Sequence, residues 1–508
     1  MTTYYVDSVA GNDTNAGTST GAPWKTIAKV NARTLVAGDY VLFKCGGLWR
    51  ERLLPHNSGT SSSQITFGSY GTGAQPKIYG SDVLSGWSIY SGNIWRAAHT
   101  GSVSPVWFIS SGGVVTWGNQ KTSVGACTVE YDWYYDTNYV YVYAATDPDS
   151  RYASVEAGYR SAGVGLNSKS YITIDDIEVA FCGQYCIELT NEGYVGWIVQ
   201  NCTLHHVGIL NSPHAHGIGS RVSNAVFQNN LIYNCGTHGI YIVGGTSPTH
   251  DVDIVGNDVS DCPHTGIDIM SYTAGTTVTD VRIRGNIVHT TSDYPGPSGM
   301  YMIGIQTLSQ GGGVCSNITI EYNIVHNAYG ISILVCDDSD TVKVINNSVY
   351  KSAGNFQGIA VLGGAINTYV LNNIVLEVGG SNYYYEAASA IAESDYNLSY
   401  HPTETTGQLF RVASTTYYLS GFSAFKSATG FETHGIWADP EFVDAAGLDF
   451  HLRTGSPAID AGTVVTGIHD VSGSIDFFGT RSPQRSKPSI GAYEYVRRII
   501  RGRVLPGL

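Results

Sequence analysis

The sequence has few charged residues and few of the residues that favour helices. Asp, Glu, Lys and Arg make up 13% of its 508 residues, whereas Gly occurs 61 times and Tyr 35 times. A chain rich in Gly, Tyr, Asn, Ser and Thr suits strands and turns better than helices. The composition therefore predicts an all-β protein, with one good helix candidate at residues 24–32.

Other absences exclude whole classes of protein. No segment is apolar for long enough to span a membrane as a helix. The formal net charge of −14 argues against a nucleic-acid partner, because binding such a partner requires a basic surface. The nine cysteines show no Cys-X-X-Cys pair and no zinc spacing. We expect Cys235 and Cys262 to be buried thiols rather than a disulfide.

What the sequence does contain is a repeat. An Asn opens each unit, a short apolar strand follows it, and successive Asn residues lie 24 to 37 positions apart by subtraction. These residues are Asn201, Asn230, Asn257, Asn286, Asn323, Asn347 and Asn373. A second signature is a small residue followed by an apolar one that we expect to face inward. Its members are Gly165-Leu166, Cys186-Ile187, Gly217-Ile218, Gly239-Ile240, Gly266-Ile267, Gly304-Ile305, Gly330-Ile331 and Gly358-Ile359.

Short strands at this spacing, with no helix between them, exclude a βαβ fold. Alternation within each strand directs one apolar side chain inward, so stacked coils bury the inner faces of parallel sheets. We expect the aligned Asn side chains to form hydrogen bonds from coil to coil. The repeats therefore predict a parallel β-helix.

Two stretches at the ends carry a family resemblance. The start contains Tyr4-Tyr5-Val6-Asp7, Gly11-Asn12-Asp13 and Pro23-Trp24-Lys25-Thr26-Ile27, and the end contains Ser456–Gly462 and Ile490–Glu494. With the repeats, they make the chain resemble the pectin-lyase-like superfamily of right-handed parallel β-helix proteins. The resemblance covers nearly the whole chain and implies a right-handed β-helix solenoid. It leaves the substrate open, because the superfamily includes lyases, hydrolases, epimerases and phage tailspikes.

Breaks in the repeat predict five segments. Residues 1–83 form the N-terminal cap and first coils, 84–157 an aromatic-rich β insertion, 158–380 the central coils with the site, 381–496 the C-terminal coils and cap, and 497–508 a basic tail. We expect the helix at 24–32 to cap the solenoid by burying Trp24, Ile27, Ala28 and Asn31. The tail is either disordered or a contact between subunits.

The insertion contains an expected β-hairpin. Residues Tyr131–Tyr143 alternate as two strands around the turn Asp136-Thr137-Asn138. Five tryptophans also fall in this segment, at Trp87, Trp95, Trp107, Trp117 and Trp133. They are either a sugar-binding platform or an aromatic minicore that packs the insertion onto the helix.

A calcium site is one interpretation of the first residues. Asp7, Asn12, Asp13 and Asn15 offer oxygen ligands, although their spacing is not that of an EF-hand. The alternative is that these residues make ordinary turns.

The histidines cluster in the central coils. Eight of the 15 lie between residues 201 and 300, among them His214 and His216. The residue after each inward apolar residue should point out of the sheet. This column is expected to hold Asn167, Glu188, Gly219, Tyr241, Asp268, Gln306, Ser332 and Ala360. Because neighbouring coils are about 4.8 Å apart, His216, His238, Tyr241 and Asp268 should lie in one patch.

We therefore expect a catalytic set and a substrate-binding set. The catalytic set is His238, Tyr241, Asp268, His264 and Asp261, and the substrate-binding set is Glu188, Arg221, His216, His214, Asp293 and Gln306. The stretch 292–297, which contains Asp293, is expected to form a loop that walls the groove. Asp261-Cys262-Pro263-His264 resembles the Asp-Pro-His motif of alginate C5-epimerases of the same superfamily, with Cys262 breaking the match.

These groups predict an enzyme that cleaves an extracellular polysaccharide: a polysaccharide lyase is the leading interpretation, and a glycoside hydrolase is the alternative. In β-elimination at a uronic acid, neutral His and Tyr act as base and acid, and Arg221 neutralises the carboxylate. Hydrolysis instead needs two carboxyl groups, which Asp268 and either Asp261 or Asp293 would supply. Non-catalytic carbohydrate binding or tailspike adhesion is a third interpretation, and a tailspike-like chain would form a homotrimer.

We expect no signal peptide in this sequence, because Tyr4-Tyr5-Val6 follows Met1 almost at once. We nevertheless expect an extracellular protein, either secreted or carried on a virion.

Overall fold

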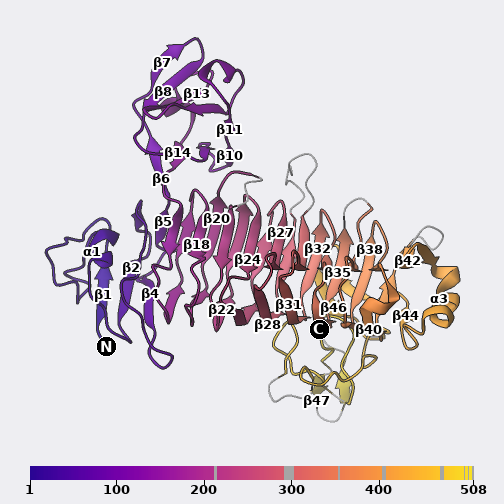
Figure 1. Ribbon diagram of the computed structural model, residues 1–508. Coiled ribbons are helices and arrows are strands. Elements are labelled where there is room, and N and C mark those ends of the chain that lie inside the picture. The colour runs from indigo at the N-terminus through magenta and orange to yellow at the C-terminus, as the bar shows by residue number, and fades with distance from the viewer. Residues whose placement is uncertain are drawn as a thin grey trace. The chain divides into compact units, whose positions relative to one another are not determined.

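The computed structural model describes residues 1–496, 498–500 and 503–505, except 211–213, 291–301, 353–354, 403–407, 470–473 and 485. The chain divides into two compact units. The N-terminal unit comprises residues 1–191, 198–220 and 232–238, and the C-terminal unit comprises 192–197, 221–231 and 239–508. Each unit is built from stacked short strands (Figure 1).

Coils of the N-terminal unit contribute strands to three parallel sheets. Sheet A holds β1 (Thr3–Val6), β2 (Tyr40–Lys44), β4 (Ile65–Tyr70), β16 (Ile172–Asp175) and β19 (Ile198–Gln200). Sheet B holds β3 (Leu48–Trp49), β5 (Lys77–Tyr79), β17 (Glu178–Ala180), β20 (Thr203–Val207) and β23 (Leu231–Cys235). Sheet C holds β15 (Ala162–Gly165), β18 (Tyr185–Leu189) and β21 (His216–Ser220).

The C-terminal unit has the same three-sheet plan. Its sheet A holds β22 (Ala225–Gln228), β25 (Thr249–Val255), β28 (Thr277–Arg284), β31 (Val314–Glu321), β34 (Asp340–Ile345), β37 (Thr368–Leu371) and β40 (Ile391–Asp395). Sheet B holds β26 (Asp258–Ser260), β29 (Ile287–His289), β32 (Ile324–Ala328), β35 (Ser348–Ser352), β38 (Ile374–Val378), β41 (Leu398–Tyr400) and β44 (Ile436–Trp437). Sheet C holds β24 (His238–Val243), β27 (Thr265–Ser271), β30 (Ile303–Ser309), β33 (Ile333–Cys336), β36 (Ile359–Val361), β39 (Tyr383–Tyr385), β42 (Gln408–Val412) and the antiparallel β43 (Thr415–Tyr418). The predicted parallel β-helix is confirmed.

Stacked apolar residues form the core of the coils. In sheet A, Ile283 pairs with Ile320 and Ile320 with Val344, and all three side chains are fully buried. Ile240 and Ile267 are likewise fully buried in sheet C, as predicted. Every second side chain of a strand points inward, and these side chains fill the interior of each coil.

Two members of the predicted inward signature are out of register by two residues. Ile187 pairs with Val164, not Leu166, and Ile305 pairs with Ile333, not Ile331. The outward column therefore contains Gly165 and Leu334, in place of Asn167 and Ser332. A shift of two residues keeps the same faces in and out, so alternation alone does not detect it.

An Asn ladder runs through the C-terminal unit. Each side-chain amide donates to the carboxamide oxygen of the next Asn, at 2.9 Å from Asn230 to Asn257 and 3.0 Å from Asn347 to Asn373. The remaining rungs join Asn257, Asn286, Asn323 and Asn347. The ladder continues to Asn397 and ends on Glu432, neither of which the repeat pattern identified.

Asn201 was wrongly assigned to this ladder. It is exposed, has a left-handed φ of 54°, and donates to the Asp175 carboxylate at 2.7 Å. The next residue, Cys202, is the buried one, and its thiol contacts backbone oxygens of Ile174 and Gln200. Asn readily adopts the left-handed turn conformation. This preference explains why an Asn occupies the exposed turn position immediately before the buried residue.

The capping helix is shorter than predicted. Helix α1 covers Ile27–Asn31, because Thr26 is extended and caps it by accepting from the Lys29 N–H. Its buried residues are Ile27 and Val30, whereas Ala28 is exposed and Asn31 is half-buried. Trp24 is buried as predicted, but it precedes the helix and bridges to Val6. Two further helices were missed, α2 (Pro148–Arg151) and α3 (Phe422–Thr429). In the described residues, no helix is long and apolar enough to cross a membrane.

The insertion forms two small sheets in the N-terminal unit (Figure 1), both antiparallel except that β11 pairs with β12 in parallel. One holds β6 (Ser81–Leu84), β9 (Val106–Ile109), β10 (Val115–Trp117) and β14 (Ser154–Gly158). The other holds β7 (Ser88–Ser91), β8 (Ile94–Ala98), β11 (Asn119–Gln120), β12 (Asp132–Tyr135) and β13 (Tyr139–Tyr143). Strands β12 and β13 make the predicted hairpin. Trp87, Trp107 and Trp133 are buried, so the minicore interpretation holds for these three.

Four further short strands, in two antiparallel pairs, lie toward the C-terminus. Strands β45 (Phe442–Asp444) and β46 (Asp449–Leu452) pair antiparallel, and in the basic tail β47 (Arg498–Ile500) pairs with β48 (Arg503–Leu505). The tail strands therefore pair with each other rather than lengthening a coil. All nine cysteines are free, and Cys235 and Cys262 are buried as predicted.

Candidate functional site

Three polar side chains lie in one outward column on sheet C of the C-terminal unit. Asp268 on β27 is the ladder partner of Gln306 on β30. On the other side, the Gly244 N–H donates to the Met270 oxygen at 2.8 Å, which places Tyr241 of β24 level with Asp268. Neighbouring strands are about 4.8 Å apart, so the three side chains are immediate neighbours.

Strand alternation explains why Asp268 faces outward. Its neighbours Ile267 and Ile269 are fully buried in the coil interior. Asp268 is nevertheless only 1% exposed. Tyr241 and Met270 are half-buried there, and the Tyr241 hydroxyl donates to the Met270 sulfur at 3.4 Å.

Burial makes the Asp268 carboxyl a weak acid. Loss of solvent raises its pKa to about 7, and the neighbouring His264 offsets part of that increase. At neutral pH, a substantial fraction of Asp268 therefore carries a proton. A carboxyl of this kind is suited to donate a proton to a leaving oxygen.

Gln306 adds an acceptor to the column. Its side chain is 4% exposed, and its Oε1 has no hydrogen-bond partner among the described residues. A buried carbonyl without a partner is costly and therefore uncommon. This oxygen is thus available to accept a hydrogen bond from a bound hydroxyl.

The turn before β27 supplies the rim of the site. His264 is exposed, and its Nδ1 lies 3.0 Å from the Thr265 hydroxyl. Asp261 is buried, with a left-handed φ of 53°. Beyond Gln306 the outer face becomes apolar, because Leu334 and Ala360 occupy the next two positions of the column.

Arg221 is already paired with a carboxylate. Its Nη1 lies 3.3 Å from Glu192, and its Nη2 donates to the Tyr272 hydroxyl at 3.4 Å. Glu192 also accepts from the Thr246 hydroxyl and the Ser247 N–H. The predicted role of Arg221 would require it to exchange Glu192 for a substrate carboxylate.

The N-terminal unit contains four other predicted residues, the three histidines described here and Glu188. The Nδ1 atoms of His216 and His238 lie 3.0 Å apart, and both side chains are buried. The Nδ1 of His214 lies 3.3 Å from the Tyr185 hydroxyl.

Glu188 forms an ion pair with Arg52, in a pocket of about 230 Å³ that Asn167 also lines. Arg52 is 136 positions away in the sequence, so the repeat pattern gave no signal for it. Asp293 and the whole of the expected wall at 292–297 lie outside the described residues.

Two of the oxygen-rich residues near the start already accept several hydrogen bonds. Asp7 accepts from the Val9 and Ala10 N–H groups and from Lys44. Asp13 accepts from the Lys25 and Thr26 N–H groups. The local bonds of Asp7 support the turn interpretation, whereas those of Asp13 hold a segment 12 to 13 residues away. A calcium ion would have to compete with both sets.

Stacked parallel coils with an acid, a phenol and an amide in one outward column define a β-helix protein with a polar site on its outer face. The chain belongs to the right-handed β-helix family. The family model described as the right handed beta helix region matches residues 112–280 and 186–375, which together span just over half of the chain.

The proteins to which the chain is similar include one relative and two solved structures. Lacto-N-biosidase of Bifidobacterium longum is 35% identical over 126 residues, a match that covers 23% of this chain and 8% of that protein. The structure of XylC with xylose has 14% identity, a TM-score of 0.59 and coverage of 97% and 98% of the two chains. Pectate lyase Pel9A has 16% identity, a TM-score of 0.55 and coverage of 97% and 96%. At these identities, the two structures show the fold alone.

Proposed function

We propose that this protein is a carbohydrate-active enzyme that cleaves a glycosidic bond of an extracellular polysaccharide, with Asp268 as the general acid. The observation that carries the proposal is a buried carboxyl with a pKa of about 7 on the outer face of a β-helix. Cleavage of a glycosidic bond requires protonation of the leaving oxygen. Gln306 would accept from a sugar hydroxyl beside it.

Hydrolysis is the chemistry that the site supports better. Its second requirement is another carboxylate, and we assign that role to Asp261 on the turn before β27. The partial match to a lacto-N-biosidase points the same way, although it covers only 8% of that enzyme. Elimination requires a cation for the uronate carboxylate, and Arg221 is already paired with Glu192.

Elimination at a uronic acid is the second candidate, and Tyr241 favours it. Its phenol is level with Asp268 in the sheet and half-buried. A neutral phenol in this position would protonate the leaving oxygen. Tyr241 and the exposed His264 are also the side chains that an incoming sugar would meet before it reaches Asp268.

A polysaccharide panel tests both chemistries. The wild-type protein is incubated with neutral and uronate-containing polysaccharides, and reducing ends and ultraviolet absorbance are followed together. Hydrolysis creates reducing ends without absorbance, whereas elimination also creates a conjugated double bond that absorbs. Tyr241→Phe should reduce the rate of elimination strongly and that of hydrolysis less. Binding without any product from the panel would contradict the enzyme proposal and favour an adhesion protein.

A further inference from the structure

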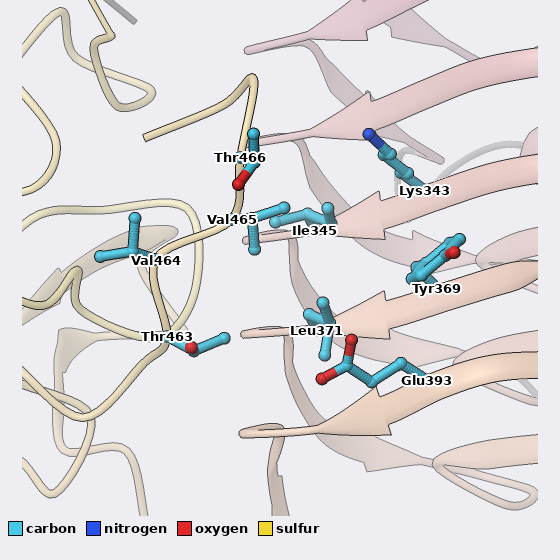
Figure 2. Close-up of a pocket in the computed structure, with 9 residues that line it drawn as sticks. All are labelled: Lys343, Ile345, Tyr369, Leu371, Glu393, Thr463, Val464, Val465 and Thr466. Atoms are coloured by element: carbon cyan, nitrogen blue, oxygen red, sulfur yellow. The ribbon is translucent and has the colours of Figure 1, made fainter. Parts of the chain in front are cut away.

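A pocket of about 330 Å³ lies on sheet A of the C-terminal unit, away from the residues of the candidate site. Strands β34, β37 and β40 form one wall, and residues 463–466 form the other (Figure 2). Its volume is within the range of small-molecule sites, about 300–1,000 Å³. None of its residues belongs to the predicted catalytic or substrate-binding sets.

An aromatic ring occupies the middle of the strand wall. Tyr369 is the ladder partner of Lys343 on one side and of Glu393 on the other. With about 4.8 Å between strands, the Lys343 and Glu393 backbones lie about 10 Å apart, with Tyr369 between them. Figure 2 shows the three side chains on successive strands, facing the space that the opposite segment encloses.

The polar ends of these side chains are available to a ligand. Lys343 and Tyr369 are half-buried and Glu393 is exposed. Within the part of the chain that the structure describes, Lys343 and Glu393 form no ion pair, and the Tyr369 hydroxyl has no hydrogen-bond partner. The pocket therefore offers one donor group, one acceptor group and one aromatic face.

The pocket has an apolar floor and a fixed wall. Ile345 and Leu371 are buried beside the column, and Val465 packs against them. Thr463 and Asn372 exchange two hydrogen bonds of 2.8 Å, which attach the opposite segment to β37. A pocket formed in advance binds with little loss of conformational entropy.

We propose that this pocket is a second carbohydrate-binding site, which takes a neutral pyranose unit of an oligosaccharide. The sugar ring stacks on Tyr369, while Lys343 donates to one hydroxyl and Glu393 accepts from another. The lining holds one positive and one negative side chain, so it favours an uncharged ring over a uronate. The ligand class rests on the proposed function. The site would hold a polysaccharide chain while cleavage takes place on sheet C.

Isothermal titration calorimetry with defined oligosaccharides tests the proposal. The probes are xylotetraose and cellotetraose as neutral sugars and tetragalacturonate as an acidic one, with the Asp268→Asn protein to prevent cleavage. At least one neutral probe should bind, and adding Tyr369→Ala should weaken that binding roughly tenfold, as expected for a lost aromatic contact. Tyr369→Phe keeps the ring and should retain most of the affinity.

Tyr384→Ala is the matched control. Tyr384 is also a half-buried tyrosine on an outer face, but it belongs to sheet C and the Arg411 guanidinium lies 4.6 Å from its ring. This variant should bind the neutral probe as the parent does. Equal affinities of the Tyr369→Ala and parent proteins, or binding of tetragalacturonate alone, would overturn the proposal.

Cleavage assays separate this proposal from the proposed function. If the wild-type protein cleaves a polysaccharide while Tyr369→Ala leaves all binding unchanged, the second site is refuted and the enzyme stands. If binding depends on Tyr369 but no polysaccharide in the panel is cleaved, the enzyme proposal is refuted and the binding site stands.

Discussion

Two carboxyl groups of the C-terminal unit are fully buried and have similar acidity, yet their surroundings differ. Burial raises the pKa of both Asp268 and Glu432 to about 7. Glu432 lies at the end of the Asn ladder, inside the coils. Asp268 lies on the outer face of sheet C, between Tyr241 and Gln306.

The contacts of Glu432 are those of a structural group. Its Oε1 accepts from the Ser394 hydroxyl at 2.5 Å and from the Asn397 amide at 2.7 Å, and its Oε2 accepts from the Asn397 N–H at 3.1 Å. It therefore terminates a ladder that would otherwise leave the last Asn without an acceptor. The comparison teaches that a raised pKa follows from burial alone. Position on an outer face, beside groups that a sugar can reach, is what suggests chemistry for Asp268.

The largest expected effect is on turnover. Asp268→Asn should reduce it by about 100-fold or more, the low end for a lost acid–base group. Its melting temperature should change little, because Asn has nearly the same volume. Glu432→Gln should keep wild-type turnover in the fraction that folds. Equal turnover of the Asp268→Asn and wild-type proteins, on a substrate that the protein cleaves, would place the catalytic acid elsewhere.

The next effect concerns stability. Glu432→Ala should lower the free energy of unfolding by about 3 kcal/mol, because three buried donors lose their acceptor at about 1–3 kcal/mol for each unsatisfied group. Urea denaturation measures this change. Glu377→Ala is the control, since Glu377 makes only a surface contact of 3.7 Å with Lys351 and should cost below about 1 kcal/mol. A similar cost for both variants would remove the distinction between the two acids.

A smaller effect is expected at Gln306. Gln306→Ala should raise KM by roughly tenfold, because a hydrogen bond of about 1.4 kcal/mol to a sugar hydroxyl is lost. Stability should stay the same or rise, since a buried oxygen without a described partner is removed. Initial-rate kinetics with melting curves measure both quantities. A large loss of stability with unchanged KM would show that Gln306 supports the fold rather than the site.

The smallest effect is the pH dependence of stability. The pKa of Glu432 is about 7 in the folded protein and near 4.5 when unfolded, so between these values the folded state binds the extra proton. Its contribution to stability is therefore lost as pH rises through this window. Glu432→Gln cannot lose a proton, so the decrease with pH should be shallower. An identical pH dependence in the two proteins would contradict the raised pKa.

The sequence predicted the coils well because their signals are local. Asn230, Asn257 and Ile267 stand where a turn or an inward position requires them, and repetition makes each visible. The sequence-based assignment failed where either of two adjacent residues could begin the repeat, as with Asn201 and Cys202. It also failed where a shift of two residues leaves the inward and outward faces of the strand unchanged, as with Ile331 and Ile333.

The site was less predictable because it depends on contacts distant in sequence. The outward column placed Asp268 beside Gln306 correctly, since both belong to the repeat. No pattern linked Glu188 to Arg52, or Tyr369 to the segment at 463–466, because neither contact repeats from coil to coil. The burial that raises the pKa of Asp268 was also invisible, because alternation gives the face of a residue but not its exposure.

The pH profile of kcat/KM tests the central claim most directly, because a general acid must be protonated to act. In the wild-type protein, kcat/KM should fall as pH rises above an apparent pKa of about 7, the value for Asp268. Glu432→Gln should show the same alkaline decrease, since that acid is structural. A profile that stays flat through this pH range, or an alkaline decrease that disappears in Glu432→Gln, would contradict the assignment of Asp268.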